Sequence, residues 1–408
     1  MEKMAEVVCG SEYQNLHHML SESAWDRGKV RRQLIVDANA HFGHVSALVI
    51  DESGFGKKGD KSAGVARQWN GRLGKTDNCR VGVFATVTRD RVAAVVDGEL
   101  YVPKEWFANP SRCEAAGIPE DQRFRTKGEM ALSMIRRLRQ EGLNYAYVVF
   151  DAGYGHLPWL LRALADDGET FLAEVHADQV IFRGDPDPFV PERQSAKGRR
   201  PTRLEAQRLP LTVSEWIAMQ PASRWRRLSV REGEKGDVVA EYLTQRVWLW
   251  DGKEARARCW HLLVRREIDG SKLKFCVSNA KPEASLRHLT EMQAARHFVE
   301  RGFEDAKGSC GLADYQVRRF NAWHHHMALV MIALMFLAKE RLANRHTAEL
   351  LSCNDLVDIL RYKLPTKIRS DEALAELIAN RHRRRQRARD HAYRKQSERL
   401  AATAFRGI

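Results

Sequence analysis

The chain has 408 residues, 44% of them hydrophobic, and a formal net charge of +14 at pH 7. This length predicts two or three structural units with a real core. A pI near 9.6 predicts an anionic partner, most commonly nucleic acid for a large basic protein, with an indifferent basic surface as the alternative. The longest apolar run, residues 327–338, is too short to span a bilayer and predicts a buried helix. The seven scattered cysteines contain no Cys-x-x-Cys pair, which argues against structural zinc and, without a signal peptide, favours a reducing cytoplasm.

Residues 1–45 have a helical pattern, and residues 46–180 predict alternating strands and helices. Strands are predicted at 47–51, 81–88, 91–101, 145–150 and 170–175, and a loop rich in Gly and Lys at 52–61. Helices are predicted at 126–142, where Thr126 and Glu129 can form a capping box, and at 157–164. The predicted order is therefore three strands, a helix, a strand, a helix and a strand. This order matches a ribonuclease-H-like core, which is a mixed sheet with helices on its faces.

The pattern changes after this core. Residues 186–210 hold five of the twelve prolines and predict a linker. Alternating apolar and polar residues then predict antiparallel strands at 239–243, 246–250, 259–264 and 273–277. One helix is predicted from 285 past 307, and a long apolar helix over 321–342.

The expected fold class is therefore α/β. A ribonuclease-H-like catalytic core, residues 46–180 and 285–345, is interrupted by a linker and β-rich insert at 181–284. Helical regions flank it, at 1–45 and, strongly basic, at 346–408.

Two aspartates, Asp51 and Asp151, each follow a predicted buried strand directly. Such residues emerge at the sheet edge where α/β proteins bind ligands. A single Asp in this place more commonly caps the next turn. Two of them, with a third carboxylate on a helix, favour a functional site.

The predicted helix from 285 supplies that third carboxylate. Arg296, Glu300 and Lys307 lie four and seven residues apart and share one face. Glu304 lies close to the same face, so spacing alone leaves either glutamate open. Three carboxylates would form an oxygen-only site for Mg²⁺ or Mn²⁺, and two such ions can promote phosphodiester cleavage. The alternative for an isolated Arg–Glu pair is a surface ion pair worth about 0.3–0.5 kcal/mol.

Together, Asp51, Asp151, Glu300, Arg296 and Lys307 resemble the Asp-Asp-Glu (DDE) transposases of bacterial insertion sequences. The helix is similar to their Tyr-x₂-Arg-x₃-Glu-x₆-Lys signature, and that match implies Glu300 rather than Glu304. Gln293 occupies the position of the signature's tyrosine. The segments similar to the insertion sequence 701 family are 48–59, 64–68, 78–83 and 100–106. The resemblance covers roughly residues 12–345.

This resemblance implies a cut-and-paste DNA transposase that hydrolyses a strand at the element end and joins the freed 3′-hydroxyl to target DNA. Asp51, Asp151 and Glu300 would hold Mg²⁺, with Mn²⁺ as a substitute and two ions in all, while Arg296 and Lys307 would bind phosphates. The implied partners are double-stranded DNA, as terminal inverted repeats and target, and a second protomer, in a bacterial cytoplasm and without a membrane.

Two alternatives remain open at this stage, a related nuclease that cuts without joining and a non-catalytic or domesticated DNA-binding derivative. Family members usually carry a longer helical DNA-binding segment, and only fifty residues precede Asp51. Region 1–45 is therefore expected to be a truncated form of that domain.

Two further groups of basic residues can be interpreted either as DNA-binding or as exposed to solvent. Lys57, Lys58 and Arg67 are candidate DNA-phosphate contacts beside Asp51, and a solvated loop is an equal alternative. Residues 381–395 hold eight Lys or Arg and one Asp, which suits phosphate binding or a solvated helix face equally.

Overall fold

The structure is a computed structural model that describes residues 2–71, 73–192, 200–233, 236–270, 272–315, 318–365, 367 and 370–404. The chain forms two compact units, Leu20–Ile359 and a smaller one composed of Met1–Met19 with Leu360–Ile408. The larger unit contains every candidate site residue. The predicted region 1–45 is divided between the units, since its third helix packs against the core of the larger one.

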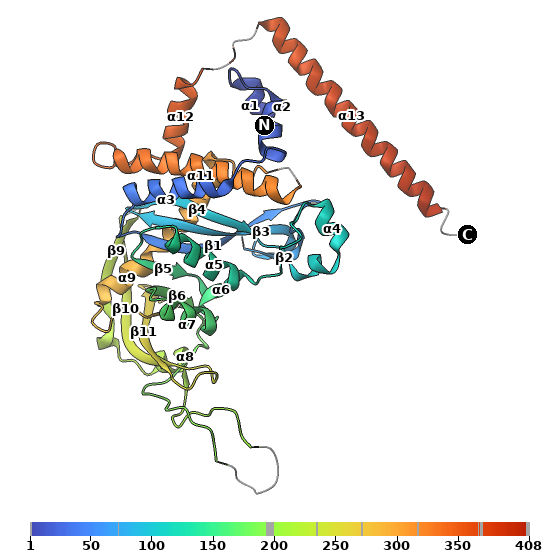
Figure 1. Cartoon of the computed structure of the whole chain (residues 1–408). Coiled ribbons are helices and arrows are strands. Elements are labelled where there is room, and N and C mark those ends of the chain that lie inside the picture. The colour runs from blue at the N-terminus through green and yellow to red at the C-terminus, as the bar shows by residue number, and fades with distance from the viewer. Residues whose placement is uncertain are drawn as a thin grey trace. The chain divides into compact units, whose positions relative to one another are not determined.

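A large mixed sheet organises the larger unit (Figure 1). Its order is β2-β3-β1-β5-β6-β12-β11-β10-β9, and β4 pairs with the free side of β3. The strands are β1 (Ala47–Gly56), β2 (Ala66–Asn70), β3 (Lys75–Arg89), β4 (Val92–Leu100), β5 (Tyr147–Phe150), β6 (Phe171–Val175), β9 (Arg226–Gly233), β10 (Gly236–Leu249), β11 (Arg258–Glu267) and β12 (Leu273–Ser278). A separate pair joins β7 (Val180–Ile181) to β8 (Leu211–Thr212).

Helices and short turns connect and cover these strands. They are α3 (Arg27–His41), η1 (Lys104–Ala108), α4 (Pro110–Ala115), α5 (Lys127–Gln140), α6 (Ala152–Gly155), α7 (Pro158–Asp166), α8 (Val213–Ala218), η2 (Ala222–Arg224), α9 (Leu286–Ala295), α10 (His297–Ser309) and α11 (Phe320–Ala343). Helix α12 (Cys353–Lys363) follows α11, and its residues from Leu360 belong to the smaller unit. The capping box predicted for α5 is confirmed, with Thr126 as its N-cap.

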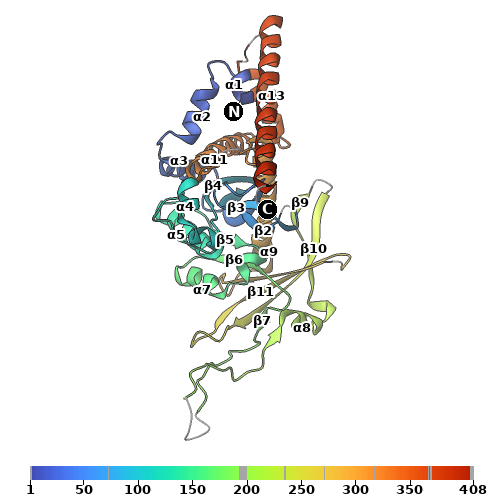
Figure 2. The ribbon, with the colours of Figure 1, turned by 90° about the vertical axis from the view of Figure 1, so that its right-hand side faces the viewer.

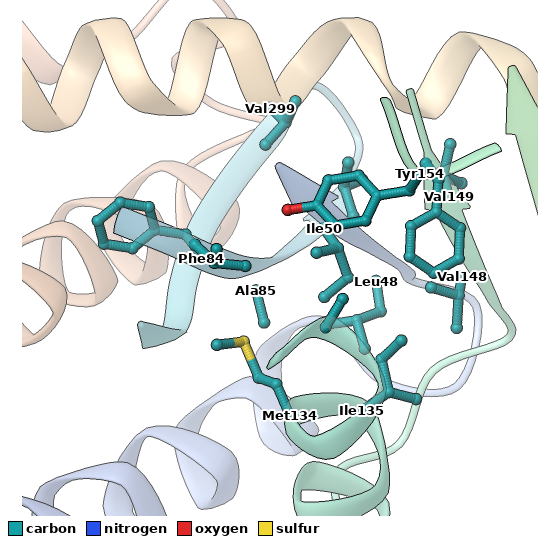
Figure 3. Packing of buried hydrophobic residues seen from close by; sticks show 14 of the residues in the cluster. Leu48, Ile50, Phe84, Ala85, Met134, Ile135, Val148, Val149, Tyr154 and Val299 are labelled. Carbon is teal, nitrogen blue, oxygen red and sulfur yellow. The ribbon is translucent and has the colours of Figure 1, made fainter. Parts of the chain in front are cut away.

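The centre of the core lies on both faces of the strands that carry the candidate aspartates. Residues 47–50 of β1 and 148–150 of β5 are almost completely buried. Figure 3 shows Met134 and Ile135 of α5 on one side of these strands and Val299 of α10 on the other. Strands that are buried on both faces have continuous apolar runs in their sequence. The sequence pattern therefore predicted the buried parts of β1 and β5 well.

The β-rich insert continues the core sheet. Strand β12 pairs antiparallel with β6, so β12, β11, β10 and β9 extend the sheet beyond the last core strand (Figures 1 and 2). The two strands predicted at 239–243 and 246–250 are one long strand, β10. Part of the predicted linker, residues 193–199, lies outside the described residues.

Two predictions about local structure are wrong. The predicted loop at 52–61 begins later, because residues 52–56 remain paired with residues 79–83 of β3 and keep β1 extended. The single helix predicted from 285 is two helices, α9 and α10, with Arg296 between them. Strand β2 was also missed, since it is short and mostly polar and is stabilised by pairing with the first part of β3.

The smaller unit is helical, with α1 (Glu2–Val7), α2 (Tyr13–Ser21, which ends in the larger unit) and α13 (Asp371–Ala404). Lys367 ties its two chain segments together, donating through Nζ to the carbonyls of Ala5 (2.7 Å) and Ser11 (2.9 Å). Arg381 of α13 also pairs with Glu6. None of the helices in the described part of the chain has the length and hydropathy that a bilayer span requires.

Candidate active site

The two candidate aspartates lie side by side in the sheet, at the carboxyl end of β5. Strands β1 and β5 are parallel, and Ile50 is in register with Phe150. Asp51, within β1, and Asp151, directly after the last residue of β5, each come one residue later, and neighbouring strands of a sheet are about 4.8 Å apart. The parallel pairing thus unites two residues a hundred positions apart in the sequence.

The surroundings of the Asp51 carboxyl raise its pKa. Burial and the nearby Asp151 carboxylate raise the pKa of Asp51 to about 7, and Arg296 and a hydrogen bond from the backbone N–H of Glu52 oppose this increase. That N–H donates to Oδ1 at 2.7 Å. Two neighbouring carboxylates repel when both are charged, and a cation between them would remove the repulsion.

The capping explanation does not account for Asp151. This residue begins α6, but its side chain makes no capping hydrogen bond. Its Oδ1 is buried without a hydrogen-bond partner among the described residues, a costly condition for a carboxylate. The unpaired oxygen and the adjacent Asp51 fit a bound cation of the hard, oxygen-preferring kind.

Arg296 faces this pair from the junction of α9 and α10. Its backbone stays helical (φ −60°, ψ −34°), but its N–H bonds to the carbonyl of Gln293, three residues earlier. Burial lowers the pKa of Arg296, while the carboxylates of Glu174, Asp51, Asp151 and Glu300 outweigh that effect and raise it. The guanidinium is therefore the charge that connects the aspartates to the helix.

Glu300 is less closely associated with the pair. Its side chain is 59% exposed, and its carboxylate lies 3.4 Å from the Arg296 guanidinium. Glu304, the other glutamate considered, is also exposed. Among the described residues, no group of three or more His, Cys, Asp or Glu side chains is arranged to hold a metal ion. The structure thus brings together Asp51, Asp151 and Arg296, with Glu300 at the edge of the group.

The remaining basic candidates lie in varied surroundings. Lys307 has its Nζ 5.7 Å from the Phe303 ring centroid. Lys57 donates to the carbonyl of Tyr315 at 2.5 Å, and burial followed by the charge of Arg80 lowers its pKa to about 8. Lys58 and Arg67 are exposed. Lys57 therefore has a partner within the chain, whereas Lys58 and Arg67 present their side chains to solvent.

Sequence reasoning missed Glu52 and Glu174. Glu52 pairs with Lys127 (2.5 Å) and accepts a hydrogen bond from Tyr154 (3.2 Å), whose ring lies beside the central strands in Figure 3. Glu174 lies on β6 and is 3.8 Å from Arg296. A charged residue inside the otherwise apolar run 171–175 was the available signal for Glu174.

The matched protein-family model settles the broad class. A model of the DDE superfamily endonucleases matches residues 1–237, more than half of the chain. The chain belongs to the DDE superfamily endonucleases. The match includes Asp51 and Asp151 and ends before Arg296 and Glu300.

A curated relative agrees with this class. The probable transposase for insertion sequence element IS701 of Microchaete diplosiphon is 26% identical over 327 residues, which cover 78% of this chain and 72% of the relative. The predicted resemblance to DDE insertion-sequence enzymes is thereby confirmed.

Among solved structures, the chain is similar to the piggyBac transposase in its synaptic complex with hairpin DNA. The TM-score is 0.39 at 12% identity, and the match covers 78% of this chain and 52% of that one. A likeness of this size carries no weight for the fold.

Proposed function

We propose that this DDE endonuclease is a DNA transposase that cleaves and joins strands at the ends of an insertion sequence by the cut-and-paste route. The observation that carries the proposal is the Asp51–Asp151 pair, which directly follows the in-register residues Ile50 and Phe150 of two parallel strands and has one buried oxygen without a hydrogen-bond partner among the described residues. The similarity to the IS701 transposase supports DNA as the substrate. The order of strands and helices supports a ribonuclease-H-like core.

The cofactor in this proposal is Mg²⁺, with Mn²⁺ as a substitute, in a site for two ions. Asp51 and Asp151 would hold the metal, and Glu300 is the proposed third ligand on the strength of the signature. A divalent ion in such a site supplies an activated water and stabilises charge on the leaving oxygen.

The chain's own cations position the DNA. The Arg296 guanidinium can donate a pair of hydrogen bonds to one phosphate, a geometry that lysine cannot offer. Lys307, about three turns along α10 from Arg296, contacts a flanking phosphate. The exposed Lys58 and Arg67 contact the backbone further along, and Lys57 keeps its loop attached to the segment after α10.

Double-stranded DNA is the proposed partner, as the terminal inverted repeats and as the target, in a bacterial cytoplasm. Two protomers are expected in the complex, because two element ends must be held together for joining. The net charge of +14 supports association with a polyanion.

A strand-transfer assay tests the proposal. A duplex that ends in an element repeat with an exposed 3′-hydroxyl is incubated with plasmid target and Mg²⁺, and covalent joining is measured on a denaturing gel. Joining by the wild type, and none by Asp51→Asn, is the expected result. Cutting without joining would indicate a nuclease, and DNA binding without either would indicate a non-catalytic derivative.

A further inference from the structure

Glu174 occupies the same position on β6 that the aspartates occupy on their strands. β5 and β6 are parallel, with Phe150 in register with Ala173, so Asp151 and Glu174 both come one residue later. Three carboxylates, in β1, directly after β5 and in β6, therefore follow one another across neighbouring strands. Residues in register point to the same face of a sheet, which directs Glu174 toward the site.

The contacts of Glu174 distinguish it from the aspartates. Its side chain is 16% exposed, and its Oε1 lies 3.3 Å from Nζ of Lys274 and 3.8 Å from Arg296. Among the described residues, Arg296 forms ion pairs with Glu174 and Glu300 and with neither aspartate. Glu174 also heads the carboxylates that raise the pKa of Arg296.

Arg296 has an unused donor. Its side chain is 17% exposed, and its Nε is buried without a hydrogen-bond partner. A buried donor left unpaired is costly, and a phosphate oxygen of DNA is the kind of acceptor that would satisfy it. A cation beside two aspartates would otherwise turn to pair with them directly.

We infer that Glu174 is a positioning residue that holds Arg296 away from Asp51 and Asp151. Arg296 is thereby kept in place to receive a DNA phosphate, while the aspartate oxygens stay open for a divalent ion. This inference rests on the proposed function and adds to it a carboxylate that acts through Arg296.

Mn²⁺ binding in the absence of DNA tests the inference without any cleavage. Isothermal titration with Mn²⁺ is performed on full-length wild type, Glu174→Gln, Arg296→Gln and the double variant. In Glu174→Gln, the released Arg296 competes with the metal for the aspartates and weakens Mn²⁺ binding by about tenfold, a typical coupling between groups in contact. Arg296→Gln should then increase the Mn²⁺ affinity much more when it is added to Glu174→Gln than when it is introduced into the wild type.

An equal increase in Mn²⁺ affinity from Arg296→Gln in the wild type and in Glu174→Gln would overturn the inference. That result is expected if Glu174→Gln weakens Mn²⁺ binding only because it removes a negative charge. Glu174→Asp should rescue Mn²⁺ binding in part. Lys274→Gln is the matched control, because it removes the other partner of Glu174, and it should leave Mn²⁺ affinity within about twofold. Normal melting temperatures for all variants would exclude a folding defect.

Strand cleavage provides a separate measurement. Glu174→Gln should lower the cleavage rate constant by about tenfold and add little to the loss caused by Arg296→Gln. Wild-type protein that binds Mn²⁺ but cleaves no DNA would refute the proposed function alone, because the Mn²⁺ comparison would still decide the role of Glu174.

Discussion

Asp51 is the residue whose charge should be most sensitive to pH. Its pKa lies at about 7 in the folded protein, compared with an ordinary value of 3.8. Between these two values the folded state retains a proton that the unfolded state has released. Because stability falls with rising pH wherever the folded state binds more protons, Asp51 should destabilise the metal-free protein as pH rises through this window.

Melting temperatures in the presence of a chelator check this prediction. Wild type should lose stability relative to Asp51→Asn as pH rises from about 4 to above 7, because Asn cannot release a proton. A difference between the two proteins that stays constant with pH would contradict the buried, repelled state of Asp51.

Lys57 and Lys58 are neighbours with opposite expected roles. Lys57→Met removes a half-buried hydrogen bond to Tyr315 and should lower the free energy of unfolding by roughly 1–3 kcal/mol. Lys58→Met, at an exposed position, should change stability by less than about 0.5 kcal/mol and weaken DNA binding instead. Chemical denaturation and a DNA-binding titration measure the two effects, and equal destabilisation by both variants would refute the assignment.

At the residue scale, the sequence predicted those features that depend on local pattern. Asp51 and Asp151 could be found because each directly follows a short apolar run in the sequence. The ion pair between Arg296 and Glu174 could not be found in this way. It depends on the pairing of β5 with β6 and on the junction between α9 and α10. Arg296 nevertheless keeps helical dihedral angles and its contact with Glu300 four residues later, and the Glu300 side chain is 59% exposed.

Among the elements, α6 must approach β6 very closely beneath the site. A Cβ added to Gly155 would lie 1.8 Å from the backbone carbonyl oxygen of Glu174, a distance that backbone atoms cannot accommodate without moving apart. Gly155→Ala should therefore destabilise the protein strongly and displace Glu174.

Gly308 in α10 is the matched control for that substitution. Nothing lies within 4 Å of a Cβ at this position, so Gly308→Ala should stabilise the protein by about 0.4–1 kcal/mol. Thermal melting compares the two, and a Gly155→Ala protein as stable as wild type would show that α6 and β6 are not so closely packed.

Elements of strong local pattern were well predicted, such as α5 with its capping box and the hairpin of β3 and β4. Those that depend on distant partners were not. Strand β2 forms only because β3 extends past the rest of the sheet to pair with it, and residues 52–56 remain a strand through the same partner. Continuation of the core sheet into the insert depends on the pairing of β12 with β6, which no local pattern reveals.

For the whole molecule, the net charge predicts strongly salt-dependent DNA binding. Each phosphate contact on duplex DNA contributes about −0.9 to the slope of log K against log salt concentration. Helix α13 carries the run of eight Lys or Arg at 381–395 and has no buried side chain among its described residues. A steep slope is expected for the wild type. Deletion of residues 381–408 should make the slope shallower by about 0.9 for each phosphate contact that is lost.

Fluorescence anisotropy over a range of salt concentrations measures both slopes. An unchanged slope after the deletion would show that α13 faces solvent and does not contact DNA. A wild-type slope near zero would remove the electrostatic argument for DNA as the partner.

The central claim is that Asp51 and Asp151, with Glu300, form the metal site of a DNA-cleaving enzyme. Its most direct test is Mg²⁺-dependent nicking of an element-end duplex by Asp51→Asn, Asp151→Asn and Glu300→Gln, with Glu304→Gln as the control. Each of the three neutral variants should bind the duplex and lose nicking, because it keeps the side-chain shape without the ligand charge, while Glu304→Gln should stay close to wild type. Substantial nicking by Asp51→Asn or Asp151→Asn would contradict the claim, and nicking retained by Glu300→Gln but lost by Glu304→Gln would move the third ligand to Glu304.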